Sequence, residues 1–250
     1  MNISYTERFQ QKDEVSSYDA AEYGAGSYAS HMWRLQRPVL ERVVGEFRAA
    51  HSQPVKLLDF ACGTGRVLSV LEPLVAAADG VDISENMVAM ARGKCSKARL
   101  LVGNILTEPA LLQPSYDLIS CFRFVLNAEP ELRGRVLKRL RQVLHSPDGL
   151  LIINMHGSSR SLRHPAIAWR RGREGARGDV MLNEMSPGEM ERLLAASGFK
   201  IIRQFGFGML PPTLYRTPLR RIAGALDGSL AGEHFWNGFA IDILYVCRPV

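Results

Sequence analysis

Apolar residues follow two alternating spacings along this 250-residue chain. Short, continuous apolar runs predict buried strands, whereas apolar positions three and four residues apart predict amphipathic helices. The expected strands cover residues 55–59, 80–82, 99–102, 116–121, 150–154, 199–203 and 239–247. The expected helices cover residues 30–50, 66–78, 84–94, 131–144, 186–197 and 219–226. This alternation predicts an α/β fold with a doubly wound, mostly parallel, seven-stranded sheet and right-handed crossovers.

Local signals mark where several of these helices begin and end. Ser84 precedes an apolar helical pattern and can cap its first turn. Ser186 is followed by a proline and, three residues on, by Glu189, which together form a strong start signal. Gly198 then ends that helix, and Pro54 prevents the first helix from continuing. These signals support the helix boundaries independently of the apolar spacing.

Two stretches interrupt the alternation of strand and helix without dividing the chain. We interpret residues 1–52 as an N-terminal helical cap and residues 53–250 as one sheet domain. Insertions at about 156–180 and 209–235 fall inside that domain. Hydrophobic residues make up 46% of the chain, so a single core of this size can form.

The net charge of +6 is concentrated in the first of these insertions. Between positions 156 and 178 there are six arginines and a single acidic residue, Glu174. The arginines are Arg160, Arg163, Arg170, Arg171, Arg173 and Arg177. Arginine binds phosphate and carboxylate groups well. The segment is therefore either a solvated face or a lid over an anionic acceptor.

Cysteine spacing and hydropathy limit the compartment and the chemistry. The four cysteines form no C-x-x-C pair and no zinc-site spacing with histidine, so we expect reduced thiols and no metal. The first 14 residues lack the apolar core of a signal peptide, and no apolar run is long enough to span a membrane. We therefore expect a cytoplasmic protein.

A turn rich in small residues follows the first expected strand. It runs from Asp59 to Gly65 through Ala61 and Gly63, and it leads directly into a helix. Small residues let the backbone approach a ligand closely, and the helix start offers free N–H groups. Asp82 ends the next strand, where doubly wound folds place an acid that binds ribose hydroxyls. We expect the ligand at the carboxyl ends of the strands.

This turn can be compared with two known motifs. A dinucleotide-binding fingerprint requires G-x-G-x-x-G, which the turn lacks. The motif D-x-A-C-G-T-G, followed by V-D-I-S, resembles instead the class I S-adenosylmethionine-dependent methyltransferases. The resemblance extends over most of the chain, including the segment S-P-D-G-L-L-I-I and the late turn Ser197 to Phe199. It implies a Rossmann-like methyltransferase fold, S-adenosylmethionine as cofactor and S-adenosylhomocysteine as product.

The resemblance also implies cofactor roles for matching positions of this sequence. Asp59 is expected to orient the turn and the methionine amino group, and Asp82 to accept hydrogen bonds from both ribose hydroxyls. Asn104 stands where many relatives carry an acid, so its amide oxygen would accept from the adenine amino group. Tyr23 belongs to a Y-D-A-A-E-Y segment that is similar to a cap over the cofactor, or it packs on a surface helix. The full set of expected contacts is Asp59, Ala61, Cys62, Gly63, Gly65, Asp82, Ile83, Met87, Asn104, Ile105, Phe122 and Tyr23.

The acceptor side has fewer distinguishing features. Histidine suits a general base near neutral pH, and the candidates are His156, just after the fifth strand, and His31, in the helical cap. Arg123 is a third catalytic candidate; it follows the fourth strand in an apolar context and needs an anionic partner, either substrate or an internal carboxylate. The expected substrate contacts are Arg123, Asn127, Arg160, Tyr28 and Tyr215.

These observations favour O-methylation of a small or amphiphilic, anionic metabolite such as a natural product, a glycan or a lipid. Two alternatives stay open: an RNA methyltransferase that uses the arginine-rich lid, and a non-catalytic binding protein with the same fold. The fourth strand is not followed by the N/D-P-P-aromatic motif of nucleic-acid amino-methyltransferases, which disfavours a nucleic-acid acceptor. The second insertion is apolar with basic edges, and the two insertions together suggest an amphiphilic acceptor or binding at a membrane surface that carries anionic lipid.

Overall fold

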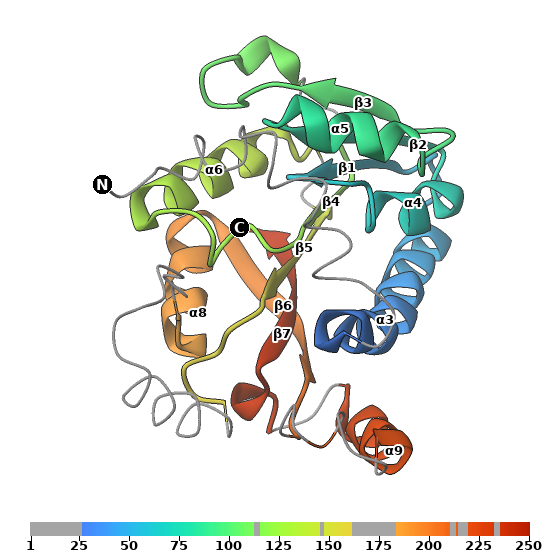
Figure 1. Ribbon diagram of the computed structural model, residues 1–250. Coiled ribbons are helices and arrows are strands. Elements are labelled where there is room, and N and C mark those ends of the chain that lie inside the picture. The colour runs from blue at the N-terminus through green and yellow to red at the C-terminus, as the bar shows by residue number, and fades with distance from the viewer. Residues whose placement is uncertain are drawn as a thin grey trace.

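The computed structural model describes residues 27–112, 116–145, 148–161, 184–210, 214, 220–232 and 236–250. At its centre is a seven-stranded sheet in the order β3-β2-β1-β4-β5-β7-β6 (Figure 1). The strands are β1 (Lys56–Phe60), β2 (Ala77–Asp82), β3 (Arg99–Val102), β4 (Leu118–Cys121), β5 (Leu150–Met155), β6 (Phe199–Phe207) and β7 (Asp242–Pro249). β1 to β5 are parallel, whereas β7 pairs antiparallel with both β5 and β6. The predicted doubly wound, mostly parallel, seven-stranded sheet is confirmed.

Helices cover both faces of this sheet (Figure 1). They are α3 (Tyr28–Ala50), α4 (Leu68–Leu71), α5 (Glu85–Arg92), α6 (Pro130–Val143), α8 (Pro187–Ala196) and α9 (Arg220–Leu230). Short 3-10 turns are η1 (Glu72–Leu74), η2 (Pro109–Leu111) and η4 (Asn237–Phe239). α3 and α4 pack on one face and α6 and α8 on the other, so the molecule has two apolar cores separated by the sheet.

The strand sequences explain why both faces are covered. Leu57 and Leu58 are neighbours in β1 and both are buried, yet they belong to opposite cores. The same alternation separates Ile152 from Ile153 in β5. Strands that are buried on both faces are continuously apolar, and this is the pattern by which the sequence predicted them.

The helix-start signals at Ser84 and Ser186 are confirmed. The Ser84 hydroxyl accepts a hydrogen bond from the Met87 N–H and caps α5. Ser186 and Glu189 form a complete capping box, in which each side chain accepts from the backbone N–H of the other. These caps fix the entry into α5 and α8 as the sequence predicted.

The predicted helix over 66–78 is wrong in its second half. The segment forms only α4 and η1, and β2 begins before the predicted helix would end. Pro73 lacks an N–H for a longer helix, and the Glu72 carboxylate accepts hydrogen bonds from three backbone N–H groups at 96–98. The last strand likewise begins at Asp242 rather than at 239, because η4 occupies the preceding residues.

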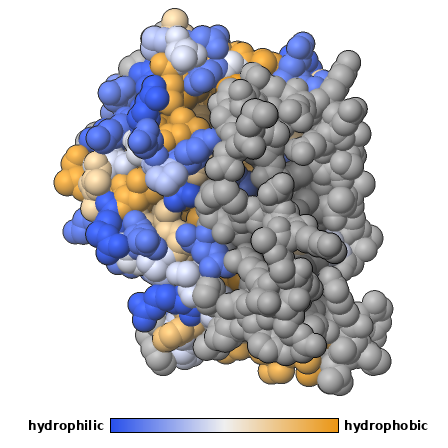
Figure 2. All heavy atoms as spheres, turned by 60° about the vertical axis from the view of Figure 1, so that its left-hand side comes forward, coloured by the Kyte–Doolittle hydropathy of each residue, from blue (hydrophilic) through white to orange (hydrophobic). Residues whose placement is uncertain are grey.

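The described surface and interior give four further findings. Within the ranges given above, no helix has both the length and the apolar character that crossing a membrane requires. Over the same residues, no three His, Cys, Asp or Glu side chains gather as a metal site. All four cysteines are buried and unpaired. On the face shown in Figure 2, apolar patches alternate with hydrophilic residues where the surface is coloured.

Candidate functional site

The carboxyl ends of β1, β2 and β4 meet at one edge of the sheet. β1 lies between β2 and β4, so the chain winds away from it in opposite directions on its two sides. Doubly wound folds bind ligands at such a switch point. Two hollows lie there, and Ala61 lines both of them.

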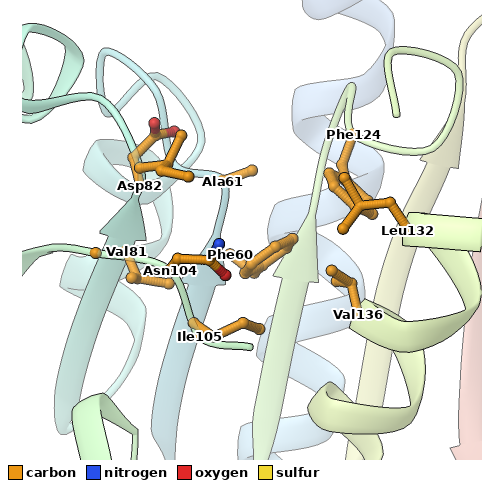
Figure 3. A pocket seen from close by; sticks show the side chains of 11 residues that line it. Phe60, Ala61, Val81, Asp82, Asn104, Ile105, Phe124, Leu132 and Val136 are labelled. Carbon is orange, nitrogen blue, oxygen red and sulfur yellow. The ribbon is translucent and has the colours of Figure 1, made fainter. Parts of the chain in front are cut away.

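The first hollow, which we call the Asp82 hollow, has one polar side. It holds about 430 Å³ of empty space, including its open mouth. Its lining residues are Phe60, Ala61, Val81, Asp82, Ile83, Gly103, Asn104, Ile105, Phe124, Leu132 and Val136. Figure 3 shows Asp82 on one side and Phe124, Leu132 and Val136 on the other. A hollow with one acid and a mainly apolar wall suits a ligand that joins a polar sugar to a flat ring.

Asp82 is held by the backbone around it. Its Oδ2 accepts a hydrogen bond from the Gly63 N–H and its Oδ1 from the Ser84 N–H, both at 2.9 Å. Burial raises the pKa of Asp82 above its ordinary value, and these N–H groups oppose that shift. Asp82 therefore links the turn after β1 to the start of α5, and its carboxylate retains acceptor capacity toward the hollow.

The second hollow, which we call the Asp59 hollow, contains the buried carboxylate of Asp59. It is lined by Asp59, Ala61, Cys62, Gly63, Thr64, Arg66, Val67, Phe122 and Arg123. Asp59 Oδ1 accepts a hydrogen bond of 2.6 Å from the Ser120 hydroxyl, whereas Oδ2 is bonded to none of the described residues. Burial raises the pKa of Asp59 to about 7, although Ser120 and the charge of Arg66 oppose the shift. Such an oxygen suits a cationic group of a ligand.

The turn after β1 needs small residues for its conformation and for its packing. Ala61, Gly63 and Gly65 all have left-handed backbones, with φ of 55°, 53° and 78°. A Cβ on Gly65 would lie 2.9 Å from Cys95 Sγ and 3.0 Å from Ala91 Cβ. Gly65 is absent from the lining of both hollows, so its role here is to let the turn pack against α5 and the loop that follows it.

Most of the remaining predicted cofactor residues lie at the hollows. Ile83, Asn104 and Ile105 line the Asp82 hollow, and Phe122 lines the Asp59 hollow. Asn104 Oδ1 already accepts a hydrogen bond of 3.0 Å from the Leu106 N–H. The expected contact between this oxygen and an adenine amino group would therefore use its second lone pair.

Besides Gly65, two predicted cofactor residues are not found there. Met87 is buried on the inner face of α5, which uses its few apolar side chains to pack on the sheet, and it lines neither hollow. Its expected contact with adenine stays a prediction. Tyr23 lies outside the described residues.

Arg123 follows β4 in a left-handed conformation, with φ of 57°. Its N–H donates to Asn154 Oδ1 at 2.6 Å, and its carbonyl accepts a hydrogen bond from the Asn127 side chain. Arg123 lines the Asp59 hollow, whereas Asn127, which we expected at the substrate, uses its amide nitrogen on this backbone. The charge of Arg123 also acts on the buried carboxylate of Asp242, so an internal anionic partner exists.

His156 directly follows β5, lies near the charge of Arg123 and is half-buried. Its Nδ1 is buried and makes no hydrogen bond to any described residue. Burial and the nearby charge of Arg123 hold the pKa of His156 well below its usual range. The imidazole is therefore neutral at physiological pH and offers an unused nitrogen.

His31, the other predicted base, has a structural partner instead. It is buried between α3 and α9, and its Nε2 lies 3.7 Å from Asp227 Oδ2. Asp227 Oδ1 accepts a hydrogen bond of 2.8 Å from the Met209 N–H. His31 lines neither hollow, as is also true of His156, and it joins two helices; its role as a base stays a prediction.

The other predicted substrate contacts are peripheral or not described. Arg160 is exposed, and its guanidinium lies 5.7 Å from the ring centroid of Phe239. For Tyr28 the structure gives only the backbone, at the first residue of α3. Tyr215 and residues 162–183, which hold most of the arginine-rich insertion, lie outside the described residues.

Sequence reasoning missed a buried polar group beside Arg123. Asp242, the first residue of β7, accepts a hydrogen bond of 3.2 Å from Asn154 Nδ2 and lies near the side chain of Gln36. Burial raises the pKa of Asp242 to about 6, although the polar side chains of Gln36 and Asn154 and the charge of Arg123 oppose the shift. The available signal was an acid inside the apolar run I-D-I-L-Y-V. Its neighbours could not be read from the sequence because they depend on strand order.

A family model described as a methyltransferase domain matches residues 29–204. The match covers β1 to β5 and the residues that line both hollows. The chain therefore belongs to this family, and its fold is that of the class I S-adenosylmethionine-dependent methyltransferases, as the sequence predicted.

Individual relatives agree with this assignment. A protein of Geobacillus sp. (strain WCH70), provisionally named a methyltransferase, is 31% identical over 108 residues, which span 41% of this chain and 43% of that protein. The magnesium protoporphyrin IX methyltransferase of Synechocystis PCC 6803, solved with S-adenosylhomocysteine, has a TM-score of 0.64 at 15% identity and covers 99% of this chain and 100% of its own. Mitomycin 7-O-methyltransferase has a TM-score of 0.58 at 14% identity and covers 99% of this chain and 61% of its own. At these identities the two structures show the fold.

Proposed function

We propose that this protein transfers a methyl group from S-adenosylmethionine to a hydroxyl oxygen of a small or amphiphilic, anionic acceptor. One observation carries the choice of oxygen as the target. His156 lies beside Arg123, its imidazole is neutral, and its Nδ1 makes no hydrogen bond to any described residue. A hydroxyl must lose its proton as the new bond forms, and a neutral imidazole can accept it.

The residues of the two hollows fit S-adenosylmethionine. The Oδ2 atom of Asp59 suits the ammonium group of the methionine part. Asp82 suits the ribose hydroxyls, and Ile83 and Ile105 offer apolar surface for the adenine. The bound donor supplies a methyl group on a cationic sulfur. The chain's own task is then to orient donor and acceptor and to exclude water.

The positive charge of Arg123 supports an anionic acceptor. Arg123 lines the Asp59 hollow, and its guanidinium keeps its charge at any relevant pH. The same charge helps to keep His156 unprotonated, because a second cation beside it is unfavourable. An acceptor with an acidic group would gain from Arg123 while it presents its hydroxyl to His156.

The alternatives rest on weaker support. The RNA hypothesis depends on arginines between 163 and 177, which lie outside the described residues. The non-catalytic hypothesis predicts a blocked cofactor site, whereas both hollows are open to the surface. Two structural neighbours act, by their names, on small molecules. Contact with an anionic membrane and a cytoplasmic location stay predictions.

The proposal is tested with S-adenosylmethionine that carries a radioactive methyl group. The purified protein is offered three acceptor pools: small metabolites, RNA and protein. We expect label in the metabolite pool, released as iodomethane by hydriodic acid, which cleaves methyl ethers. His156→Ala should slow transfer at least about 100-fold, and His145→Ala, a change at an exposed histidine, should not. Label confined to RNA, or an unchanged rate in His156→Ala, would contradict the proposal.

A further inference from the structure

The backbone at Arg123 is held in a conformation that residues with side chains seldom adopt. Its φ of 57° is left-handed, although Arg123 is not a glycine. Such a conformation persists where the surroundings determine it from several sides. Here Asn154 accepts from the Arg123 N–H at 2.6 Å, and Asn127 donates to the Arg123 carbonyl. Phe122 and Arg123 form part of the wall of the Asp59 hollow, so this conformation shapes that wall.

The Asn154 amide can accept the hydrogen bond from the Arg123 N–H in one orientation only. Asn154 is 2% exposed, and its Nδ2 donates to Asp242 Oδ1 at 3.2 Å. A flipped amide would turn its NH₂ group toward the Arg123 N–H and its oxygen toward the carboxylate. Both contacts would then be repulsive. Asp242 therefore determines which end of the Asn154 amide faces Arg123.

Asp242 reaches this position because β7 is antiparallel to β5. Ile243 pairs with Met155, so the start of β7 lies beside the carboxyl end of β5. Asp242 is buried there and lies near the side chain of Gln36 of α3 and the charges of Arg123 and Arg66. Neither Asp242 nor Asn154 lines a hollow, so both act on the site through Arg123.

We propose that Asn154 and Asp242 are positioning residues that set the Phe122–Arg123 wall for the methionine end of the donor. The inference rests on the proposed placement of S-adenosylmethionine across the two hollows. The wall lies at the Asp59 hollow, whereas the nucleoside part of the donor would occupy the Asp82 hollow. Loss of either residue should therefore weaken the binding of ligands that carry the amino-acid part. The binding of ligands that have only the nucleoside part should not change.

Two ligands separate these parts in a calorimetric titration of the whole chain. S-adenosylhomocysteine has both parts, whereas 5′-methylthioadenosine lacks the amino-acid group. We expect Asn154→Leu and Asp242→Leu to weaken S-adenosylhomocysteine about tenfold, the effect of one misplaced hydrogen-bonding group. Binding of 5′-methylthioadenosine should change less than about twofold. Asp242→Asn, which keeps an oxygen for the Asn154 amide, should restore most of the affinity.

A matched control is Asn237→Leu. Asn237 is also a buried asparagine, and its Nδ2 donates to the Gln204 carbonyl at 2.7 Å, away from both hollows. The Asn237→Leu protein should bind both ligands with the affinity of the wild type. The inference would be overturned, while the donor site stands, if the Asn154 and Asp242 variants bound both ligands equally more weakly than the wild type. It would also be overturned if they bound both ligands as tightly as the wild type. If the wild type binds neither ligand, the donor site and this inference both fall. If Asn154→Leu does not fold, Asp242→Leu tests the same contact from its other end.

Discussion

Replacing Asp82 with asparagine tests how one carboxylate can serve both the fold and the ligand. In the wild type its two oxygens accept from the N–H groups of Gly63 and Ser84, both at 2.9 Å. An amide of the same shape has one oxygen and one NH₂ group. Asp82→Asn therefore keeps one of these contacts and turns the other into two facing donors.

The expected losses follow from these contacts. A hydrogen bond to a charged group contributes about 1.5–3 kcal/mol, so the free energy of unfolding should fall by roughly that amount. Ligand binding loses more, because the ribose hydroxyls lose a charged acceptor and the Gly63 turn shifts. A loss of about 3 kcal/mol corresponds to roughly a 100-fold weaker binding of S-adenosylhomocysteine.

Calorimetry with S-adenosylhomocysteine and urea unfolding measure the two losses on the same sample. The control is Asp148→Asn, because Asp148 is exposed and its ion pair with Arg248 is 3.7 Å long. Exposed pairs contribute at most about 1 kcal/mol, so both measurements should stay near the wild type. The reasoning would be refuted by an Asp82→Asn protein that binds S-adenosylhomocysteine within about threefold of the wild type.

Two further predictions concern buried acids. Burial alone raises the pKa of Glu72, but three backbone N–H groups lower it overall, so Glu72→Gln should cost about 1–3 kcal/mol of unfolding free energy at pH 7. This difference should shrink as the pH falls through the lowered folded pKa, and thermal melts at pH 7 and pH 3 would show it; an equal difference at both would contradict it. Burial raises the pKa of Asp59 to about 7, so affinity for S-adenosylhomocysteine should rise between pH 6 and 8 as the carboxylate forms. Ser120→Ala should move that calorimetric midpoint upward, and 5′-methylthioadenosine, which lacks the ammonium, should show no such rise.

The parts of this protein that the sequence predicted are those encoded by neighbouring residues. The strands could be read as apolar runs because both of their faces are buried, and the α8 start because Ser186 and Glu189 satisfy each other's backbone. The motif from Asp59 to Asp82 indicated the place where the two hollows lie, because its members come from two consecutive strands and one turn.

The sequence was least informative where distant segments meet. His31 suggested a base by its chemistry, but its partner Asp227 lies on a helix far along the chain. Asp242 went unnoticed because its importance depends on β7 lying between β5 and β6. Apolar spacing gives the period of an element and not its neighbours.

The place of β7 has a consequence for how the molecule assembles during synthesis. Residues 242–249 leave the ribosome after the other six strands of this sheet, yet they fill the gap between β5 and β6. Until then the edge of β5 is unpaired, and Asn154 has no carboxylate to orient it. The nascent chain can thus form the Asp82 side of the cleft early, whereas the Arg123 side must wait for strand insertion. Long-range pairing of this kind is slow, so ligand binding should appear late in folding.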